Sequence, residues 1–203
     1  APGELEEALE NVLAGRYALD VRFTLEARVV GRDGNERPPY VALNDAVLHK
    51  GGFARVIRLA VYVGPEREEV GLYTADGIII ATPTGSTAYS LSAGGPIVTP
   101  SVDCILATPI CPHTLAVRPL VVPATTTLVV EVAPPVEELM LTVDGPEGEP
   151  LQAGDQLVVR RGTATVPLVR LPGYGFLSTL RRKLHWGPSH SPAVEPRSAT
   201  LRH

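Results

Sequence analysis

The sequence predicts a mainly β protein of the α+β class, with a β-sandwich-like or layered architecture and few helices. Its apolar stretches are short, and several alternate with polar residues at the period of a half-buried strand. The 20 prolines and 19 glycines separate these stretches as frequent turns do. No regular alternation of strands and helices, which would indicate a parallel sheet, occurs along the chain. With 44% hydrophobic residues, the 203-residue chain can bury a sizeable core.

The chain opens with a predicted helix over residues 4–14. Its leucines and valine recur at helical spacing, glutamates crowd its first turn, and Gly15 is a typical helix end. The period then changes to two over residues 21–29, which predicts a half-buried strand. The sequence Asp33-Gly34-Asn35 predicts the turn that follows it.

Most of the later apolar runs have the length of a strand. We expect strands at residues 40–43, 46–49, 57–63, 70–73, 77–81, 104–107, 120–122, 127–132, 139–143, 156–159 and 165–171. A second helix is expected over residues 86–93, which Gly94-Gly95-Pro96 would end, and a third over residues 176–184.

The last 17 residues differ from the rest of the chain. Residues 187–203 are rich in proline and serine and contain few apolar side chains. Such a segment cannot bury enough apolar surface to offset the entropy of ordering. We therefore expect one β-rich domain over residues 1–186, followed by a disordered tail over residues 187–203.

Composition excludes several classes of partner. A formal net charge of −4 provides no basic field for nucleic acid. No apolar run approaches the roughly 20 residues of a membrane span. Cys104 and Cys111 match no zinc-site spacing with the histidines. We expect two buried free thiols in a reducing, cytoplasmic compartment, and no membrane partner.

The segment after residue 81 is the most informative part of the chain. The apolar run 78–81 predicts a buried strand, and it leads into Thr82-Pro83-Thr84-Gly85-Ser86-Thr87. Small hydroxyl side chains and glycine leave backbone amides open to a ligand. The same residues also suit an ordinary turn that caps a helix. Composition alone therefore leaves both interpretations open.

A polar pair, Asn44-Asp45, interrupts the apolar run at residues 40–49. Polar side chains in such a run are costly unless they form hydrogen bonds. A bulge or a turn cap would account for the pair. A binding site would account for it equally, because an asparagine amide offers both a donor and an acceptor to a nucleotide edge.

The order of the motifs resembles that of the ATP-dependent NAD kinases. The stretch at residues 75–96 looks like their nucleotide-binding signature. Further stretches that resemble the family follow its order, at residues 42–48, 108–115 with 118–123, and 141–145. Residues 182–186 also resemble the end of the family's core. The resemblance covers nearly the whole chain except its tail, and it implies a β-rich C-terminal domain that packs against an α/β domain.

The resemblance also implies a set of NAD-binding residues. These are Asn44, Asp45, Arg55, Asp76, Thr84, Thr87, Ala88, Tyr89, Ser90 and Ser92. Arg55 is equally well explained as a solvated arginine at a strand edge, and Asp76 as a β-turn aspartate before glycine. Two positions depart from the family pattern, because Thr74 stands where a basic residue is common and Pro146 where glutamine is common.

One family element is missing from these residues. The string Gly-Gly-Asp-Gly-Thr, which holds phosphates and supplies the catalytic aspartate in the family, does not occur. Gly51-Gly52 is followed by Phe53, and Gly94-Gly95 by Pro96. We therefore expect a chain without the family's N-terminal α/β domain, with no catalytic residue and no metal ligand of its own. The Mg²⁺ would be carried with ATP and not bound by this domain alone.

The resemblance implies a function for the intact protein. An NAD kinase transfers a phosphoryl group from ATP, or from polyphosphate in some members, to the adenosine-ribose 2′-hydroxyl of NAD, giving NADP. The resemblance implies NAD and ATP as substrates and a homo-oligomer. The chain alone is expected to be inactive. The alternatives are a lipid or sphingoid-base kinase C-terminal domain, a non-catalytic nucleotide-binding or oligomerisation module, and a β-sandwich domain with another ligand.

Overall fold

The computed structural model describes residues 2–51, 56–114, 116–134, 139–145 and 147–186. Arg55, Pro146 and the expected tail at residues 187–203 lie outside the described residues. The chain divides into two compact units, one formed by residues 19–169 and the other by residues 1–18 together with 170–203. The expected single domain over residues 1–186 stays a prediction.

The larger unit contains two sheets of six strands. The first sheet has, in spatial order, β2 (Tyr40–Ala42), β1 (Ala18–Val30), β12 (Gln156–Arg170), β9 (Leu128–Ala133), β4 (Ile57–Val63) and β5 (Glu68–Ala75). The second has β11 (Glu147–Leu151), β10 (Leu139–Val143), β3 (Asp45–Lys50), β6 (Gly77–Ala81), β7 (Cys104–Ile110) and β8 (Leu120–Pro123). Neighbouring strands such as β1 and β2, β3 and β6, and β6 and β7 pair antiparallel. Short turns can join neighbouring antiparallel strands.

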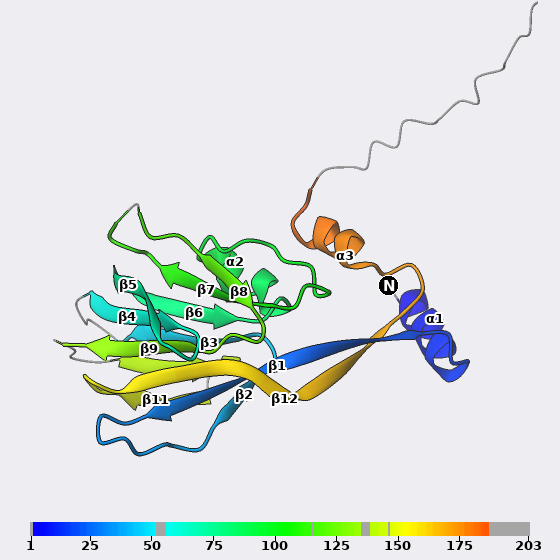
Figure 1. The fold of residues 1–203 in the computed structure, drawn as a ribbon. Helices are drawn as coiled ribbons and strands as arrows, with labels where there is room; N and C mark the ends of the chain where they lie inside the picture. The colour runs from blue at the N-terminus through cyan, green and yellow to red at the C-terminus, as the bar shows by residue number, and fades with distance from the viewer. Residues whose placement is uncertain (1, 52–55, 115, 135–138, 146, 187–203) are drawn as a thin grey trace, which may run out of the picture. The chain divides into compact units, whose positions relative to one another are not determined.

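The two sheets pack face to face around a single core (Figure 1). Leu25 and Leu59 of the first sheet and Leu48 and Ile80 of the second belong to one buried cluster. Alternating side chains of a strand point to opposite faces, so each strand contributes every second residue to this layer. The expected mainly β, sandwich-like fold is confirmed.

The middle strands β6 and β7 of the second sheet are buried on both faces. Val47, Ile79 and Leu106 form a smaller cluster on the face away from the main core, where Ala93 and Val98 cover them. A strand covered on both sides has no position for a polar side chain. This explains why residues 78–81 form an uninterrupted apolar run and why all five residues of β6 are buried.

The chain passes from one sheet to the other between β2 and β3. β2 pairs with β1 in the first sheet, whereas β3 pairs with β6 and β10 in the second. The polar pair at Asn44 and Asp45 therefore lies at a junction of the two layers. We call residues 43–45 the sheet crossing.

The smaller unit contains two helices, α1 (Pro2–Leu13) and α3 (Phe176–Lys183), close to the bounds that the sequence predicts. The apolar residues of the α1 stripe are exposed, at Leu5, Leu9, Val12 and Leu13. In α3, Leu180 is buried and Leu177 is exposed. No helix among the described residues is long and apolar enough to cross a membrane.

Several sequence predictions differ from the structure. The strands expected at 156–159 and 165–171 form one strand, β12. Gly162, near its middle, lies against β1, where a Cβ would be 2.6 Å from Thr24 Oγ1. Strand β11 was not predicted, because an edge strand with Pro150 and alternating charge lacks an apolar pattern. Both cysteines are free, as expected, but Cys111 is exposed and Cys104 alone is buried.

The helix expected at residues 86–93 is also wrong. The segment forms a short 3₁₀ turn, η1 (Gly85–Thr87), and one turn of helix, α2 (Tyr89–Ser92). Ala88 separates them with φ −97° and ψ −129°, which is not helical. The contacts that impose this break belong to the candidate site.

Candidate functional site

Residues 82–86, which we call the hydroxyl loop, are fastened to the sheet crossing by hydrogen bonds. The Thr82 hydroxyl donates to the Leu43 carbonyl over 2.6 Å, and the Thr82 amide donates to the Asn44 carbonyl over 2.9 Å. The same hydroxyl accepts from the Gly85 amide over 3.1 Å. The small polar residues therefore satisfy buried backbone groups of the crossing, which an apolar turn would leave unpaired.

Gly85 touches the crossing directly. A Cβ at this position would lie 2.2 Å from the Asn44 carbonyl oxygen and 2.8 Å from its Cα. Both neighbours are backbone atoms, so neither can rotate aside. Only glycine allows the hydroxyl loop to approach the crossing this closely.

Asp144 closes the arrangement from a third segment, the turn after β10. Its carboxylate accepts backbone N–H groups from Leu43 over 2.6 Å, from Asn44 over 2.8 Å and from Asp45 over 3.0 Å. In return, the Asp144 amide donates to the Asp45 carbonyl over 3.0 Å. The backbone of the crossing is therefore bonded on both of its sides.

Asp45 is 6% exposed, and among the charged predicted ligands that the structure describes it is the most buried. Burial, with the nearby Asp144 charge as a second cause, raises the pKa of Asp45 from 3.8 to about 6. The neighbouring Asn44 is half-buried. A perturbed carboxyl beside a half-buried amide is the kind of pair that binding sites contain.

The predicted residues after the hydroxyl loop separate into two groups. Thr87, Ala88, Tyr89 and Ser92 are exposed. Ser90 is buried instead, and its hydroxyl lies 2.9 Å from that of Thr108. A Cβ on Gly95 would lie 2.2 Å from Ser90 Oγ and 2.8 Å from Thr108 Oγ1, so Gly95 allows the turn to pack against β7. The predicted role of Ser90 in binding stays a prediction.

A pocket of about 310 Å³ lies at the other end of β3 and β6, lined by His49, Lys50, Asp76, Tyr89, Ile110 and Thr142. We call it the Asp76 pocket. It brings together two predicted ligands, Asp76 and Tyr89. Lys50 and Asp76 form an ion pair of 2.8 Å there. A cation therefore stands beside Asp76 although Thr74, at the position where the family has a basic residue, is neutral.

The two groups of predicted residues lie at opposite ends of one strand pair. Asp45 pairs with Ala81 at one end of β3, and His49 pairs with Gly77 at the other. At the usual rise of a strand the ends are roughly 15 Å apart. Asn44, Asp45 and Thr84 are grouped at the crossing, and Asp76 and Tyr89 at the pocket.

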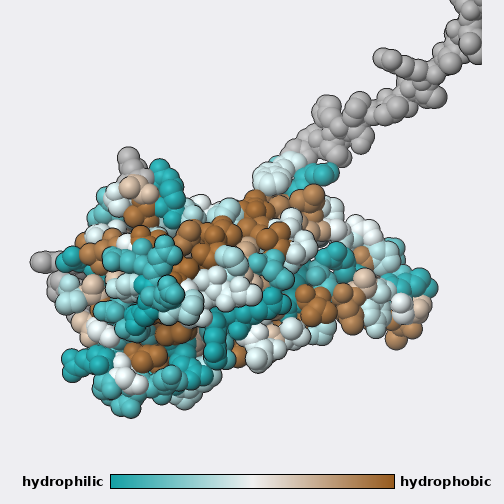
Figure 2. All heavy atoms as spheres, in the orientation of Figure 1, coloured by the Kyte–Doolittle hydropathy of each residue, from teal (hydrophilic) through white to brown (hydrophobic). Residues whose placement is uncertain are grey.

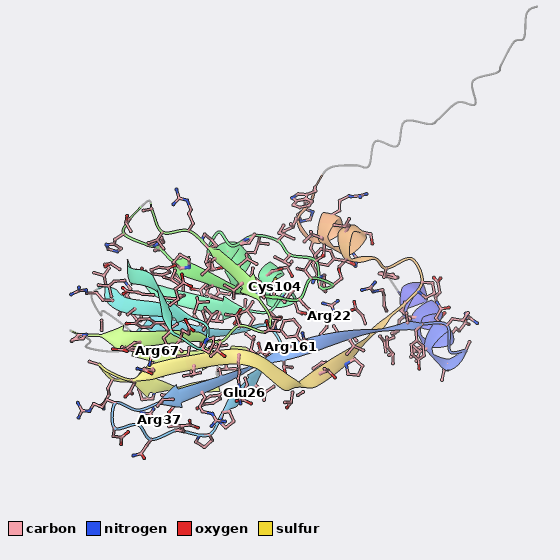
Figure 3. All side chains as sticks on the ribbon, viewed as in Figure 1. Arg22, Glu26, Arg37, Arg67, Cys104 and Arg161 are labelled. Atoms are coloured by element: carbon pink, nitrogen blue, oxygen red, sulfur yellow. The ribbon has the colours of Figure 1, made fainter. Side chains whose placement is uncertain are left out.

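Arg22 is a site residue that sequence reasoning missed. Its guanidinium donates to Thr84 Oγ1 over 3.0 Å and to Asp20 over 2.6 Å, and its side chain is 12% exposed (Figure 3). Its Nε is buried with no hydrogen-bond partner among the described residues. Val21 beside it is exposed. Hydrophobic alternation predicts Val21 on the buried side of β1 and Arg22 on the solvent side, so no sequence pattern indicated Arg22.

Comparisons with known proteins identify the family to which this sequence is similar. The profile of a family described as the ATP-NAD kinase C-terminal domain matches residues 43–171, a range that contains the crossing, the hydroxyl loop, the Asp76 pocket and Asp144. The chain belongs to the NAD kinase family. Arg22 lies outside the matched range.

Named relatives share extensive sequence with the chain. An NAD kinase of Gemmatimonas aurantiaca is 48% identical over 184 residues, which are 91% of this chain and 63% of the relative. An NAD kinase of Symbiobacterium thermophilum is 53% identical over 182 residues, which are 90% of this chain and 63% of the relative. The chain therefore spans about 63% of the length of these relatives.

Solved structures of NAD kinases share the fold. Yeast NADH kinase complexed with NADH has a TM-score of 0.82 and 31% identity, covering 92% of this chain and 56% of that one. An NAD kinase from Archaeoglobus fulgidus in complex with ATP has a TM-score of 0.71 and 23% identity, covering 93% of this chain and 68% of that one. At that identity, the second likeness concerns the fold alone.

Proposed function

We propose that this chain forms the NAD-binding part of an NAD kinase, with the sheet crossing as the centre of its site. The intact protein would transfer the γ-phosphoryl of ATP to the adenosine-ribose 2′-hydroxyl of NAD. Family membership supports the reaction class, and the relative solved with NADH supports a dinucleotide ligand. The observation that carries the proposal is the fixed crossing, whose Asn44 and Asp45 side chains come from a backbone bonded on two sides.

The chemistry of the crossing suits a nucleoside. The Asn44 amide can donate and accept toward one base edge or ribose. The Asp45 carboxylate, when ionised, accepts from ribose hydroxyls. Because both side chains extend from a backbone that is already held, little conformational entropy is lost when a ligand binds.

We further propose that the Asp76 pocket contributes a second set of NAD contacts. Tyr89, 47% exposed, presents an aromatic face that a heterocycle can stack on. Asp76 can accept from an exocyclic amine or a hydroxyl, and Lys50 lies beside it in an ion pair of 2.8 Å. The pocket of about 310 Å³ is small for a whole dinucleotide and suits one of its two halves.

Phosphoryl transfer itself depends on positioned phosphates and a divalent metal. We propose that a polypeptide limited to these 203 residues binds NAD without making NADP, because the sequence lacks a Gly-Gly-Asp string. The intact enzyme would take Mg²⁺ with ATP, work in the cytoplasm and assemble as a homo-oligomer.

The proposal is tested with the intact protein and with its Asn44→Ala variant. We expect the wild type to convert NAD to NADP in the presence of ATP and Mg²⁺, and to bind NAD in calorimetry. The variant should bind NAD more weakly and ATP unchanged. Absence of both NAD binding and NADP formation in a folded wild-type sample would overturn the proposed function.

A further inference from the structure

We propose that Asp144 is a positioning residue of the NAD site, which orients Asn44 and Asp45 by holding the backbone of the sheet crossing. The inference rests on the proposed function. It assigns a role to a side chain that need not touch the ligand. The carboxylate of Asp144 lies on the turn after β10, and the residues that it holds come from a segment about 100 positions earlier in the chain.

The geometry is that of a carboxylate cradled by successive amides. One oxygen, Oδ2, accepts from Leu43, and the other, Oδ1, accepts from Asn44 and Asp45. Consecutive backbone N–H groups that converge on one anion make a concave binding surface for it. Here the anion is a side chain of the protein itself, so the crossing is fixed before any ligand arrives.

The crossing needs such a partner. Leu43 and Asn44 lie between β2 and β3, outside the ladders of both sheets. Their amides therefore have no strand partner, and amides left unpaired in a partly buried site destabilise the conformation that exposes them. Without the Asp144 carboxylate, other backbone conformations of the crossing become competitive.

The backbone of Asp144 is adapted to this role. Its φ of 45° lies in the left-handed region, which aspartate and asparagine tolerate better than most residues. An Asp144→Asn exchange therefore keeps the turn and the side-chain size. It replaces one acceptor oxygen by an NH₂ group, which faces an N–H donor whichever way the amide is turned. Asp144→Ala would add backbone strain to the loss of acceptors, so asparagine is the sharper probe.

The position of the crossing also determines the position of the hydroxyl loop. The Asn44 carbonyl accepts from Thr82 and touches Gly85, so a displaced crossing loses its fit to the loop as well. Asp144 also acts through charge, because its carboxylate is one of the causes that raise the pKa of Asp45. The replacement should therefore alter both the orientation and the titration of the predicted ligands.

The experiment compares steady-state kinetics of the intact wild type and Asp144→Asn. We expect the KM for NAD to rise by roughly ten- to a hundred-fold, as loss of one or two well-placed hydrogen bonds does, with kcat and the KM for ATP within about threefold. The lower limb of the pH profile for NAD should move to lower pH, because Asp45 loses a neighbouring charge. A purely structural role would instead lower kcat with the fraction of folded enzyme and leave the KM for NAD unchanged.

Asp33→Asn is the matched control, because Asp33 also accepts a backbone amide, from Asn35 over 3.0 Å, in a turn remote from the crossing. It should leave both KM values unchanged. An unchanged KM for NAD in Asp144→Asn, or an equal loss for NAD and ATP, would overturn the inference. Should that variant not fold, Asp144→Glu keeps the charge and displaces it by one methylene. The KM for NAD of that variant is then compared with the KM of the wild type and of Asp33→Asn.

The wild type separates the two proposals. If it neither binds NAD nor forms NADP, the proposed function fails. If it does both and Asp144→Asn equals it, only the positioning role fails.

Discussion

The two ends of the β3–β6 pair differ in how fully they are built. At the sheet crossing, Leu43, Asn44 and Asp45 are held by Asp144 on one side, and the crossing also bonds the hydroxyl loop. At the Asp76 pocket, a half-exposed tyrosine and one ion pair face open space. The first end is organised before a ligand arrives, and the second can adjust to it. Ligand specificity is therefore expected to depend more on the crossing.

Polar and apolar side chains are interspersed over the face of the larger unit that Figure 2 shows. The contrast between the ends lies in hydrogen bonds and burial, and substitutions at each end can test it.

The largest effect is expected for Gly85→Ala. Its Cβ would lie 2.2 Å from the Asn44 carbonyl oxygen, and only a backbone shift can relieve the clash. We expect the KM for NAD to rise at least roughly a hundred-fold, equivalent to about 2.7 kcal/mol. Gly175→Ala is the control, because its φ of −87° suits alanine and its Cβ would meet only Ser178 Oγ, at an ordinary contact distance of 3.6 Å. Equal NAD kinetics in the two variants would contradict the close approach.

Next in size is the difference between Asn44→Ala and Asp76→Ala. Both should raise the KM for NAD more than that for ATP, by roughly ten- to a hundred-fold, since a buried hydrogen bond to the ligand is lost. Asn44→Ala should be the more damaging, because Asp76 is partly exposed and already paired with Lys50. The reverse order would show that the pocket, not the crossing, dominates NAD binding.

A smaller and pH-dependent effect is expected at Asp45. Its pKa is raised from 3.8 to about 6, so the folded state keeps a proton that the unfolded chain releases. The stability contributed by this group is therefore complete below pH 3.8 and is lost as the pH rises to about 6. Binding has the opposite sign, because the ionised carboxylate is the better acceptor. The KM for NAD should fall as the pH rises through about 6.

Asp45→Asn is the variant with which the pH dependence of stability is compared. The variant cannot titrate at this position, so its free energy of unfolding, from urea titrations at pH 4 to 7, should lack the wild type's decline of up to about 1.4 kcal/mol per pH unit. An identical pH dependence in the two proteins would show that another group is responsible.

The smallest effect is expected for Lys50→Gln. Lys50 and Asp76 have exposed fractions of 32% and 29%, and an ion pair this exposed contributes about 0–1 kcal/mol. Thermal unfolding should change by a few degrees at most. The KM for NAD should rise less than fivefold, by roughly the same free energy. A loss as large as that of Asn44→Ala would mean that Lys50 binds the ligand directly.

Sequence patterns predicted the fold well because periodicity reports burial. The run at residues 78–81 predicted a strand, and β6 confirms it, since both of its faces are covered. The helix expected at residues 86–93 failed for a tertiary reason. Gly85 is held against Asn44 and Ser90 against Thr108, and the backbone leaves the helical region at Ala88 to reach both.

The candidate site was predicted in part. Asn44, Asp45 and the hydroxyl loop interrupt apolar runs, and such interruptions are visible in a sequence. Arg22 and the role of Asp144 were not predictable, because each depends on partners that are distant in the chain. Hydrophobic alternation places Arg22 on the solvent side of its strand, whereas in the structure its guanidinium donates to Thr84 Oγ1.

The most direct measurement is a crystal structure of the intact protein with NAD bound. The account predicts polar atoms of one NAD molecule within hydrogen-bond distance of the Asn44 amide and the Asp45 carboxylate. It also predicts that the Asp144 carboxylate still accepts from the amides of the crossing and makes no contact with the ligand. NAD bound elsewhere, with Asn44 and Asp45 free of it, would contradict the account.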